Sequence, residues 1–102
     1  MPWYDYLAAF FAGAFLANFV PHFVQGVSGD PFPTPFAKPP GRGLSSPTIN
    51  VLWALLNLAI GYLLLRAGQV SPNRLAPLLI FFAGIAVMSL MLSKGFQDKH
   101  PR

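Results

Sequence analysis

The 102-residue chain contains no cysteine and only three acidic residues, beside seven lysines and arginines. The absence of cysteine excludes disulfides, thiolate catalysis and cysteine-based metal sites. Asp5, Asp30 and Asp98 lie in three separate segments, so no acid–base pair is visible, and no Ser-His-Asp spacing or phosphate-binding glycine motif occurs. The basic residues form no run typical of nucleic-acid binding. These absences predict a protein that is not an enzyme, has no catalytic residues, and holds no cofactor, metal or nucleic acid.

Charged residues make up only 10% of the chain, against 54% hydrophobic residues, whereas soluble domains average about 25% charged. Residues 7–24, 49–65 and 75–93 carry no charged side chain. Each run is close to the ~20 residues that cross a hydrocarbon layer of about 30 Å. The sequence therefore predicts a single all-α integral membrane domain over residues 1–102, with the lipid bilayer as its surroundings. Its expected parts are transmembrane helices at about 6–24, 47–66 and 74–94, a proline-rich loop at 26–47 and a short basic tail at 95–102.

Local signals predict how two of these helices begin and end. Ser46 followed by Pro47 is typical of a helix start, since serine caps free amides and proline suits the first helical position. Gly68 is expected to end the second helix in the left-handed conformation. Pro21 removes a backbone donor from the first span, so we expect that helix to bend or end near Val20.

The connection between the second and third spans, residues 67–73, is short. Because short connections join neighbouring elements, we expect these two spans to form a tight antiparallel hairpin. Asn73 is expected to cap the third helix.

Small residues mark possible helix contacts. Ala9, Gly13 and Ala17 recur at intervals of four in the first span, a spacing that lets another helix backbone approach closely. Gly61 in the second span and the pair Ala83 and Gly84 in the third extend this set of helix-packing candidates. We expect these faces to pack within the protomer or between protomers, although alanine is also common by chance in such segments.

Polar side chains gather near one end of the first two spans. Asn18 and His22 share a face of the first helix, while Asn50 and Asn57 share a face of the second, with Trp53 on its flank. An unpaired amide in hydrocarbon costs several kcal/mol, so these faces should meet protein or water. The five residues form a candidate polar cluster or ligand contact. His22 has three possible roles, a proton carrier, a ligand to a buried cofactor, or a hydrogen-bond anchor for the loop, and the anchor is favoured.

The loop between the first two spans alternates proline with other residues, which favours extended geometry. We expect its two phenylalanines to enter the bilayer interface or pack over helix ends, and its backbone amides, Ser28 and Thr34 to donate hydrogen bonds to the polar cluster. The alternative is a stiff linker lying on lipid head groups. The candidate functional residues of the loop are Asp30, Phe32, Phe36, Lys38 and Arg42.

Basic residues are unevenly distributed around the spans. Lys38, Arg42, Lys94, Lys99 and Arg102 belong to the loop and the tail, whereas only Arg66 and Arg74 lie on the other side. Because basic residues are enriched in cytoplasmic segments, this distribution predicts a cytoplasmic loop and C-terminus and an N-terminus outside.

The segment from Asn18 to Asn57, with its Pro21-His22-Phe23 triplet, its alternation of proline and phenylalanine and its Ser45-Ser46-Pro47 triplet, resembles a family of small uncharacterised bacterial inner-membrane proteins. The resemblance implies a multi-pass protein of the bacterial inner membrane. It implies no activity and assigns no site residues.

Two functions are compatible with these patterns. The favoured one is a non-enzymatic accessory or scaffolding subunit of a membrane complex or a homo-oligomer, held through the small-residue faces. The alternative is a binding module or oligomeric pathway for an apolar small molecule such as a lipid, quinone or pigment, near the polar cluster.

Overall fold

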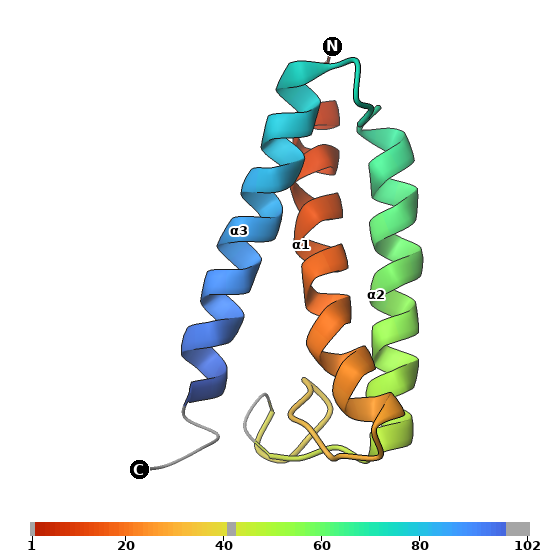
Figure 1. The fold of residues 1–102 in the computed structure, drawn as a ribbon, viewed down its shortest axis with the longest axis vertical. Helices are drawn as coiled ribbons and strands as arrows, with labels where there is room; N and C mark the ends of the chain where they lie inside the picture. The colour runs from red at the N-terminus through yellow and green to blue at the C-terminus, as the bar shows by residue number, and fades with distance from the viewer. Residues whose placement is uncertain (1, 41–42, 98–102) are drawn as a thin grey trace.

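The computed structural model describes residues 2–40 and 43–97, which form three α-helices and no β-strand. Helix α1 spans Trp3–Val27, α2 spans Pro47–Ala67 and α3 spans Leu75–Gln97 (Figure 1). All three are long and apolar enough to cross a membrane. The expected all-α fold with three potential membrane spans is therefore confirmed, and the structure fits a multi-pass transmembrane protein.

The distribution of side chains between interior and surface is the reverse of a soluble protein. The largest fully buried side chains include Asn50, Asn57 and Thr34, and most of the buried apolar residues are alanines. Large apolar side chains cover the outside instead, among them Leu63 and Leu90, which are 67% and 69% exposed. Water would leave this apolar surface unfavourably hydrated, whereas lipid chains cover it at no cost.

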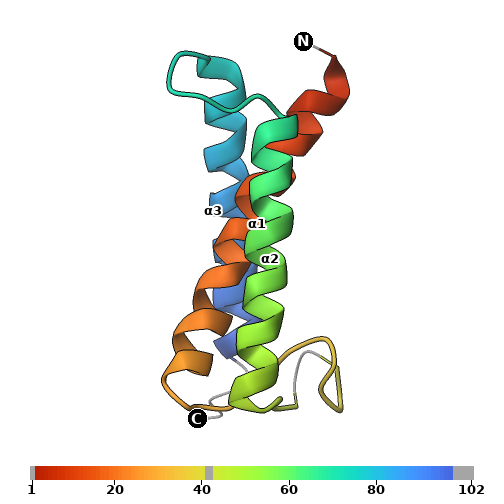
Figure 2. The ribbon, with the colours of Figure 1, turned by 90° about the vertical axis from the view of Figure 1, so that its right-hand side faces the viewer.

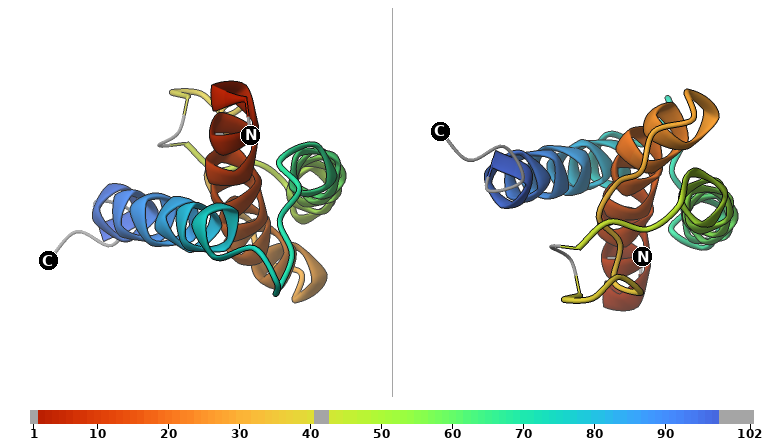
Figure 3. Two further views of the ribbon diagram at one scale, coloured as in Figure 1. Left: turned by 90° about the horizontal axis from the view of Figure 1, so that it is seen from above. Right: turned by 90° about the horizontal axis from the view of Figure 1, so that it is seen from below.

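Helix α1 lies between α2 and α3, as both end-on views show (Figure 3). No Cα atom of α2 comes within 8 Å of one in α3, so the expected tight packing of these two helices is wrong. The short connection joins only their ends. Ala12, Gly13 and Ala14 are consecutive and all buried, so α1 presents small side chains in more than one direction and accepts a helix on each side.

The loop and the end of α3 lie at one end of the bundle, and the start of α1 and the connection between α2 and α3 lie at the other (Figure 2). Helix α1 continues through Pro21 to Val27 and is curved in its last turns (Figure 1). Of the two outcomes expected at Pro21, a bend or an end of the helix near Val20, the structure therefore shows the bend. The missing amide of a proline removes only one hydrogen bond of the helix. The last turn then packs closely against α2, where a Cβ atom on Gly26 would lie 2.7 Å from the Val51 side chain.

Ser46 caps α2 as expected, since its Oγ accepts a hydrogen bond from the Ile49 amide at 3.2 Å and Pro47 follows at the first helical position. The other end differs from the prediction. Gly68 has a φ of −78°, and the left-handed residue is Gln69, with a φ of +55°. The Val70 amide donates back to the Leu65 carbonyl, as in a Schellman ending.

Gly68 is needed for a close contact and not for its conformation. A Cβ atom at this position would lie 2.6 Å from the backbone nitrogen of Ala9 in α1. Next to it, the Gln69 side-chain Nε2 donates to the buried Asp5 carboxylate, and Arg74 Nη1 donates to the Gln69 side-chain oxygen. The Arg74 carbonyl accepts from the Leu78 amide, so Arg74 and not Asn73 precedes the first turn of α3.

Glycines also set the contacts of α1 with both neighbouring helices. A methyl group on Gly13 would overlap the Phe81 carbonyl of α3, and one on Gly84 would overlap the Phe10 carbonyl of α1. On the other side, a Cβ atom on Gly61 of α2 would lie 2.6 Å from the Leu16 side chain. These glycines therefore make helix contacts within the protomer.

The remaining packing candidates differ among themselves. Ala9 is fully buried, and Ala17 is half-buried beside α3. Ala83 is exposed, so the expectation that Ala83 and Gly84 share one contact face is wrong. Neighbouring residues lie about 100° apart around a helix, and the contact face of α3 is centred on Gly84.

Candidate functional site

Four elements meet at the loop end of the bundle: the last turns of α1, the first half of α2, the loop and the end of α3. His22 of α1 and Asn50 of α2 are 2% and 0% exposed, and His22 Nδ1 lies 2.8 Å from Asn50 Oδ1. They are brought together because α1 ends and α2 begins at the same depth. The sequence placed both residues in one cluster, and the structure joins them directly.

Asn50 connects α1 to the loop. Its Nδ2 donates to the carbonyls of Phe32 at 3.0 Å, Ser45 at 3.2 Å and Ser46 at 3.0 Å. Because carbonyls only accept hydrogen bonds, the amide nitrogen must face them and Oδ1 must face His22. His22 Nδ1 therefore carries the proton of this hydrogen bond. Nδ1 is the only ring nitrogen of His22 that has a hydrogen-bond partner among the described residues.

A second polar pair joins α1 and α2 deeper in the bundle, about one turn from His22 along α1 and about two turns from Asn50 along α2. Asn18 Nδ2 donates to Asn57 Oδ1 at 3.0 Å, and Asn57 Nδ2 donates to the Trp53 carbonyl at 2.7 Å. Asn57 is 1% exposed. Each pair satisfies groups that hydrocarbon would leave unpaired.

The loop is folded onto itself and onto α2. Phe32 and Ser45 form an antiparallel bridge, with Phe32 N to Ser45 O at 3.2 Å and Ser45 N to Phe32 O at 3.0 Å. Thr34 Oγ1 lies 2.5 Å from Ser45 Oγ and accepts from the Phe36 amide. The residues on both sides of this bridge are therefore held over the start of α2.

The expected direction of hydrogen bonding between the loop and the cluster is wrong. The loop supplies carbonyl acceptors, and Asn50 supplies the donors. Ser28 donates to the Val24 carbonyl within its own turn, and Thr34 pairs inside the loop. An asparagine amide carries two donor hydrogens, which suits it to collect several carbonyls of a folded loop.

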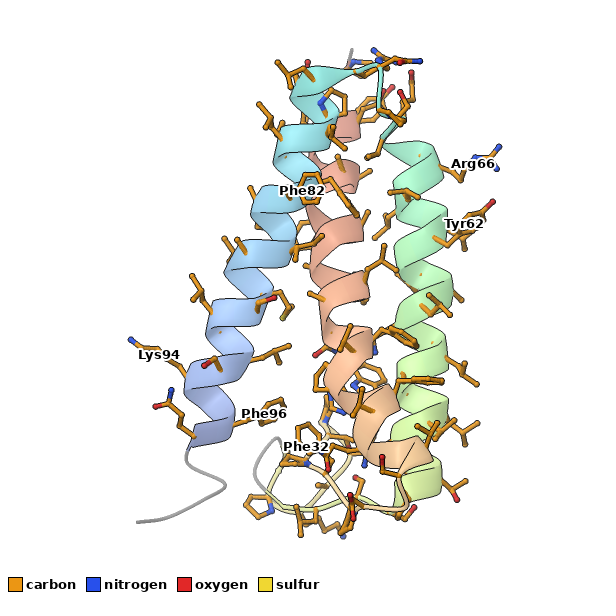
Figure 4. All side chains as sticks on the ribbon, viewed as in Figure 1. Phe32, Tyr62, Arg66, Phe82, Lys94 and Phe96 are labelled. Atoms are coloured by element: carbon orange, nitrogen blue, oxygen red, sulfur yellow. The ribbon has the colours of Figure 1, made fainter. Side chains whose placement is uncertain are left out.

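Aromatic rings enclose the His22 side chain. Phe32 is buried, with its ring centroid 5.3 Å from that of His22 and 4.6 Å from that of Phe96. Phe96 points from α3 toward Phe32 in the loop, whereas Lys94 points away from the bundle (Figure 4). Phe36 is 64% exposed and contacts Trp53 edge to face, with centroids 5.2 Å apart. Phe32 thus packs over the helix ends as expected, while Phe36 lies at the surface.

A small pocket of about 220 Å³ lies within this enclosure. It has a polar wall of side chains capable of hydrogen bonding and an apolar wall of proline, leucine and phenylalanine. Its lining residues are Asn18, His22, Pro33, Thr34, Pro35, Trp53, Leu92 and Phe96. Trp53 Nε1 is a buried donor that has no hydrogen-bond partner among the described residues. A buried donor without an acceptor is uncommon. Because this nitrogen has almost no accessible surface, other atoms of the indole form the pocket wall.

Two larger apolar hollows adjoin this pocket. One of about 400 Å³ runs between α1 and α3 and shares Leu92 and Phe96 with it. The other, of about 540 Å³, lies on the outer side of α2 and has Trp53 and Phe36 in its wall. The polar pocket therefore opens among surfaces suited to apolar chains.

The charged candidates lie apart from the pocket. Asp30 and Lys38 are exposed and contribute no side chain to the cluster, and Arg42 lies outside the described residues. Arg66 points outward with Tyr62 from the far half of α2 (Figure 4), and its Nη1 donates to the Tyr62 hydroxyl at 3.0 Å. No group of three His, Cys, Asp or Glu side chains capable of holding a metal occurs in the described part of the chain.

Sequence reasoning missed Leu92 and Phe96, which complete the pocket from α3. The two residues lie four apart on one helical face, at the end of α3 expected near the loop, and that spacing was the available signal. Gly26 was not among the candidates either, yet it allows α1 to approach the start of α2, because a Cβ atom on it would lie 2.9 Å from the Pro47 carbonyl oxygen.

Comparison of the chain with protein-family models, curated proteins and solved structures finds no match.

Proposed function

We propose that this chain is a non-enzymatic integral membrane protein that binds a small, mainly apolar molecule in the pocket between α1, α2, α3 and the loop. The observation that supports the proposal most is the pocket itself, a hollow of about 220 Å³ that has hydrogen-bonding side chains on one side and continues on the other into the apolar hollow between α1 and α3.

The walls also suit such a ligand. Thr34 and His22 are almost fully buried and give the pocket its polar side, while Leu92 and Phe96 continue into the apolar hollow between α1 and α3. Sites for small molecules typically combine an apolar lining with a few placed polar groups. Lipids, quinones and pigments share the required combination of a small polar group and an apolar body.

Mass spectrometry of the purified protein tests the proposal. The protein is purified in mild detergent, and the molecules extracted with it are compared between Leu92→Trp, which fills the pocket, and Leu90→Trp, which lies on the outward face of α3. We expect one apolar species to accompany the parent protein and Leu90→Trp and to be depleted from Leu92→Trp. Equal recovery of every species from both variants would contradict the proposal.

A second candidate is an accessory or scaffolding subunit of a membrane complex or homo-oligomer. It is favoured by α3, whose most apolar window has a mean hydropathy of 2.5 and is only 11% buried, and by the outward position of Ala76 and Ala83. Small residues on an exposed face permit a further helix to approach. Ala83→Trp should then dissociate an assembly that Phe82→Trp, about 100° away around the helix and also exposed, leaves intact, as measured by native mass spectrometry.

For localisation we propose the bacterial inner membrane, with the N-terminus outside and the loop and C-terminus in the cytoplasm. The support is the excess of basic residues in the loop and tail over Arg66 and Arg74 in the opposite segment. A phosphatase fused after Arg102 should be inactive, and one inserted after Asn73 should be active. The reverse pattern would overturn the orientation.

A further inference from the structure

We infer that the outer side of α2 holds one acyl chain of an anionic phospholipid, whose head group lies beside Lys38. The site is the hollow of about 540 Å³ on this side of the helix, which we call the outer hollow. It shares only Trp53 with the described lining of the smaller pocket, so the inference does not depend on the proposed ligand. The residues that line the outer hollow are Phe36, Ser45, Ser46, Ile49, Leu52, Trp53 and Leu56.

The outer hollow matches one leaflet of a bilayer in length and polarity. It begins at two serines, Ser45 and Ser46, beside the start of α2, and it extends to Leu56. At about 1.5 Å per residue, the helix from Ser46 to Leu56 is about 15 Å long. This length is half of a hydrocarbon layer of about 30 Å. A lipid chain in the outer hollow therefore has its polar end at the serines and its tail directed toward the middle of the membrane.

The loop gives the outer hollow a wall that a bare helix surface lacks. Phe36 is 64% exposed, and its ring meets the Trp53 ring edge to face, with centroids 5.2 Å apart. The Phe36 amide donates to Oγ1 of the buried Thr34, which holds this part of the loop in place. The exposed Leu52 and Leu56 of α2 line the same hollow. A chain lying there contacts both loop and helix and gains more dispersion contacts than a lipid against an open helix face.

Lys38 supplies a positive charge near the polar end of the outer hollow. It is exposed and follows Phe36 by two residues. A Cβ atom on Gly43 would overlap the Lys38 carbonyl, and Gly43 precedes Ser45 by two residues. Lys38 therefore lies between two parts of the loop that line the hollow, whose described lining contains no acidic side chain. Because basic residues at a membrane surface attract anionic lipids, this end favours a negatively charged head group over a zwitterionic one.

Native mass spectrometry of the full chain tests the chain site. Delipidated protein in mild detergent is titrated with phosphatidylglycerol, and the bound lipids are counted per protomer. Leu56→Trp fills the outer hollow, whereas Leu58→Trp lies about 160° away around α2, and both leucines are exposed. We expect one tightly bound lipid on the parent protein and on Leu58→Trp. Binding to Leu56→Trp should be weaker by about tenfold or more, the loss of contact with about two methylene groups.

Equal binding of phosphatidylglycerol to Leu56→Trp and Leu58→Trp would overturn the inference. Leu92→Trp, which fills the smaller pocket from α3, should retain the lipid. Loss of the lipid from Leu92→Trp together with its retention by Leu56→Trp would place the lipid in the smaller pocket and would also overturn the inference.

The head group is tested by comparing phosphatidylglycerol with phosphatidylcholine of the same chains. We expect the parent protein to bind phosphatidylglycerol about fivefold more tightly, the effect of one lysine near an anionic lipid. Lys38→Gln should abolish this preference. Lys94→Gln should keep it, because Lys94 points away from the bundle (Figure 4). If the parent protein binds both lipids equally, or if Lys38→Gln keeps the preference, the assignment of an anionic head group beside Lys38 is wrong.

Discussion

Helix α1 makes two very different contacts. Toward α2 it makes two buried polar pairs, Asn18 with Asn57 and His22 with Asn50, in addition to glycine contacts. Toward α3 the described residues form no side-chain hydrogen bond, and the helices approach through Gly13 and Gly84. In a membrane, where burying apolar surface between helices gains little, these are the two available ways to hold helices together.

The two contacts determine different properties of the bundle: the hydrogen bonds determine the register of two helices, and the glycines determine the distance between them. Hydrogen bonds between amides fix the register of α1 on α2, because a shift of one residue would leave several buried groups unpaired. Glycine contacts set how closely the two backbones approach. The pocket takes its polar wall from the first contact and its apolar wall from the second.

The largest effect is expected from Asn50→Ala, which breaks the polar contact and the attachment of the loop together. The change leaves the His22 donor and the carbonyls of Phe32, Ser45 and Ser46 without their partner. We expect the free energy of unfolding to fall by about 3 kcal/mol or more. Reversible unfolding in mixed micelles measures it, with the exposed Asn73→Ala as a control that should change by less than about 0.5 kcal/mol.

Gly84→Ala breaks the contact with α3 and leaves the polar pairs alone. The added methyl group would overlap the Phe10 carbonyl and lie 3.2 Å from the Ala14 amide nitrogen, so we expect a loss of about 1–3 kcal/mol. Gly95→Ala, in the same helix with open space around it, should gain about 0.5–1 kcal/mol. If both variants changed the free energy of unfolding in the same direction, the close contact at Gly84 would be contradicted.

Gln69 sharpens the comparison at the opposite end of α2, where a hydrogen bond and an unfavourable backbone conformation occur in one residue. Gln69→Gly and Gln69→Ala both remove the bond to Asp5. Alanine is strained at a positive φ, as glutamine is, whereas glycine is not. The free energy of unfolding of the glycine variant should therefore be higher than that of the alanine variant by about 1 kcal/mol. Equal unfolding free energies would argue against the left-handed conformation.

The smallest effect is expected from the coupling of Asn18 with Asn57. A double-mutant cycle with alanine at both positions isolates their interaction from the bond of Asn57 to the Trp53 carbonyl. Hydrogen bonds between membrane helices average about 0.6 kcal/mol, and we expect a coupling of that size. A coupling of zero would mean that the pair merely tolerates burial.

The sequence predicted the three helices and the position of the polar cluster well, because hydropathy and helical periodicity are local properties. It placed Asn18, His22 and Asn50 near one another, since their depth follows from counting along each helix. It could not pair Asn18 with Asn57, because that choice depends on the relative register of two helices.

The order of the helices was not predictable in the same way. A short connection between α2 and α3 suggested a packed hairpin, but the buried small residues of α1 allow it to lie between them. The role of Phe96 depends on that arrangement, because only a central α1 brings the end of α3 beside His22 and Phe32. Such positions depend on tertiary packing, which the sequence pattern of a single helix does not indicate.

The most direct test of the account is hydrogen exchange of the Phe32 and Ser45 amides, which bond to each other's carbonyls beneath Asn50. If the link from His22 through Asn50 holds the loop over the pocket, both amides are protected, and His22→Ala should speed their exchange by about tenfold or more. The exposed Val24→Ala, half a turn away on α1, should leave the rates unchanged. Exchange of the two amides at the same rate in the parent protein and in His22→Ala would contradict the central claim.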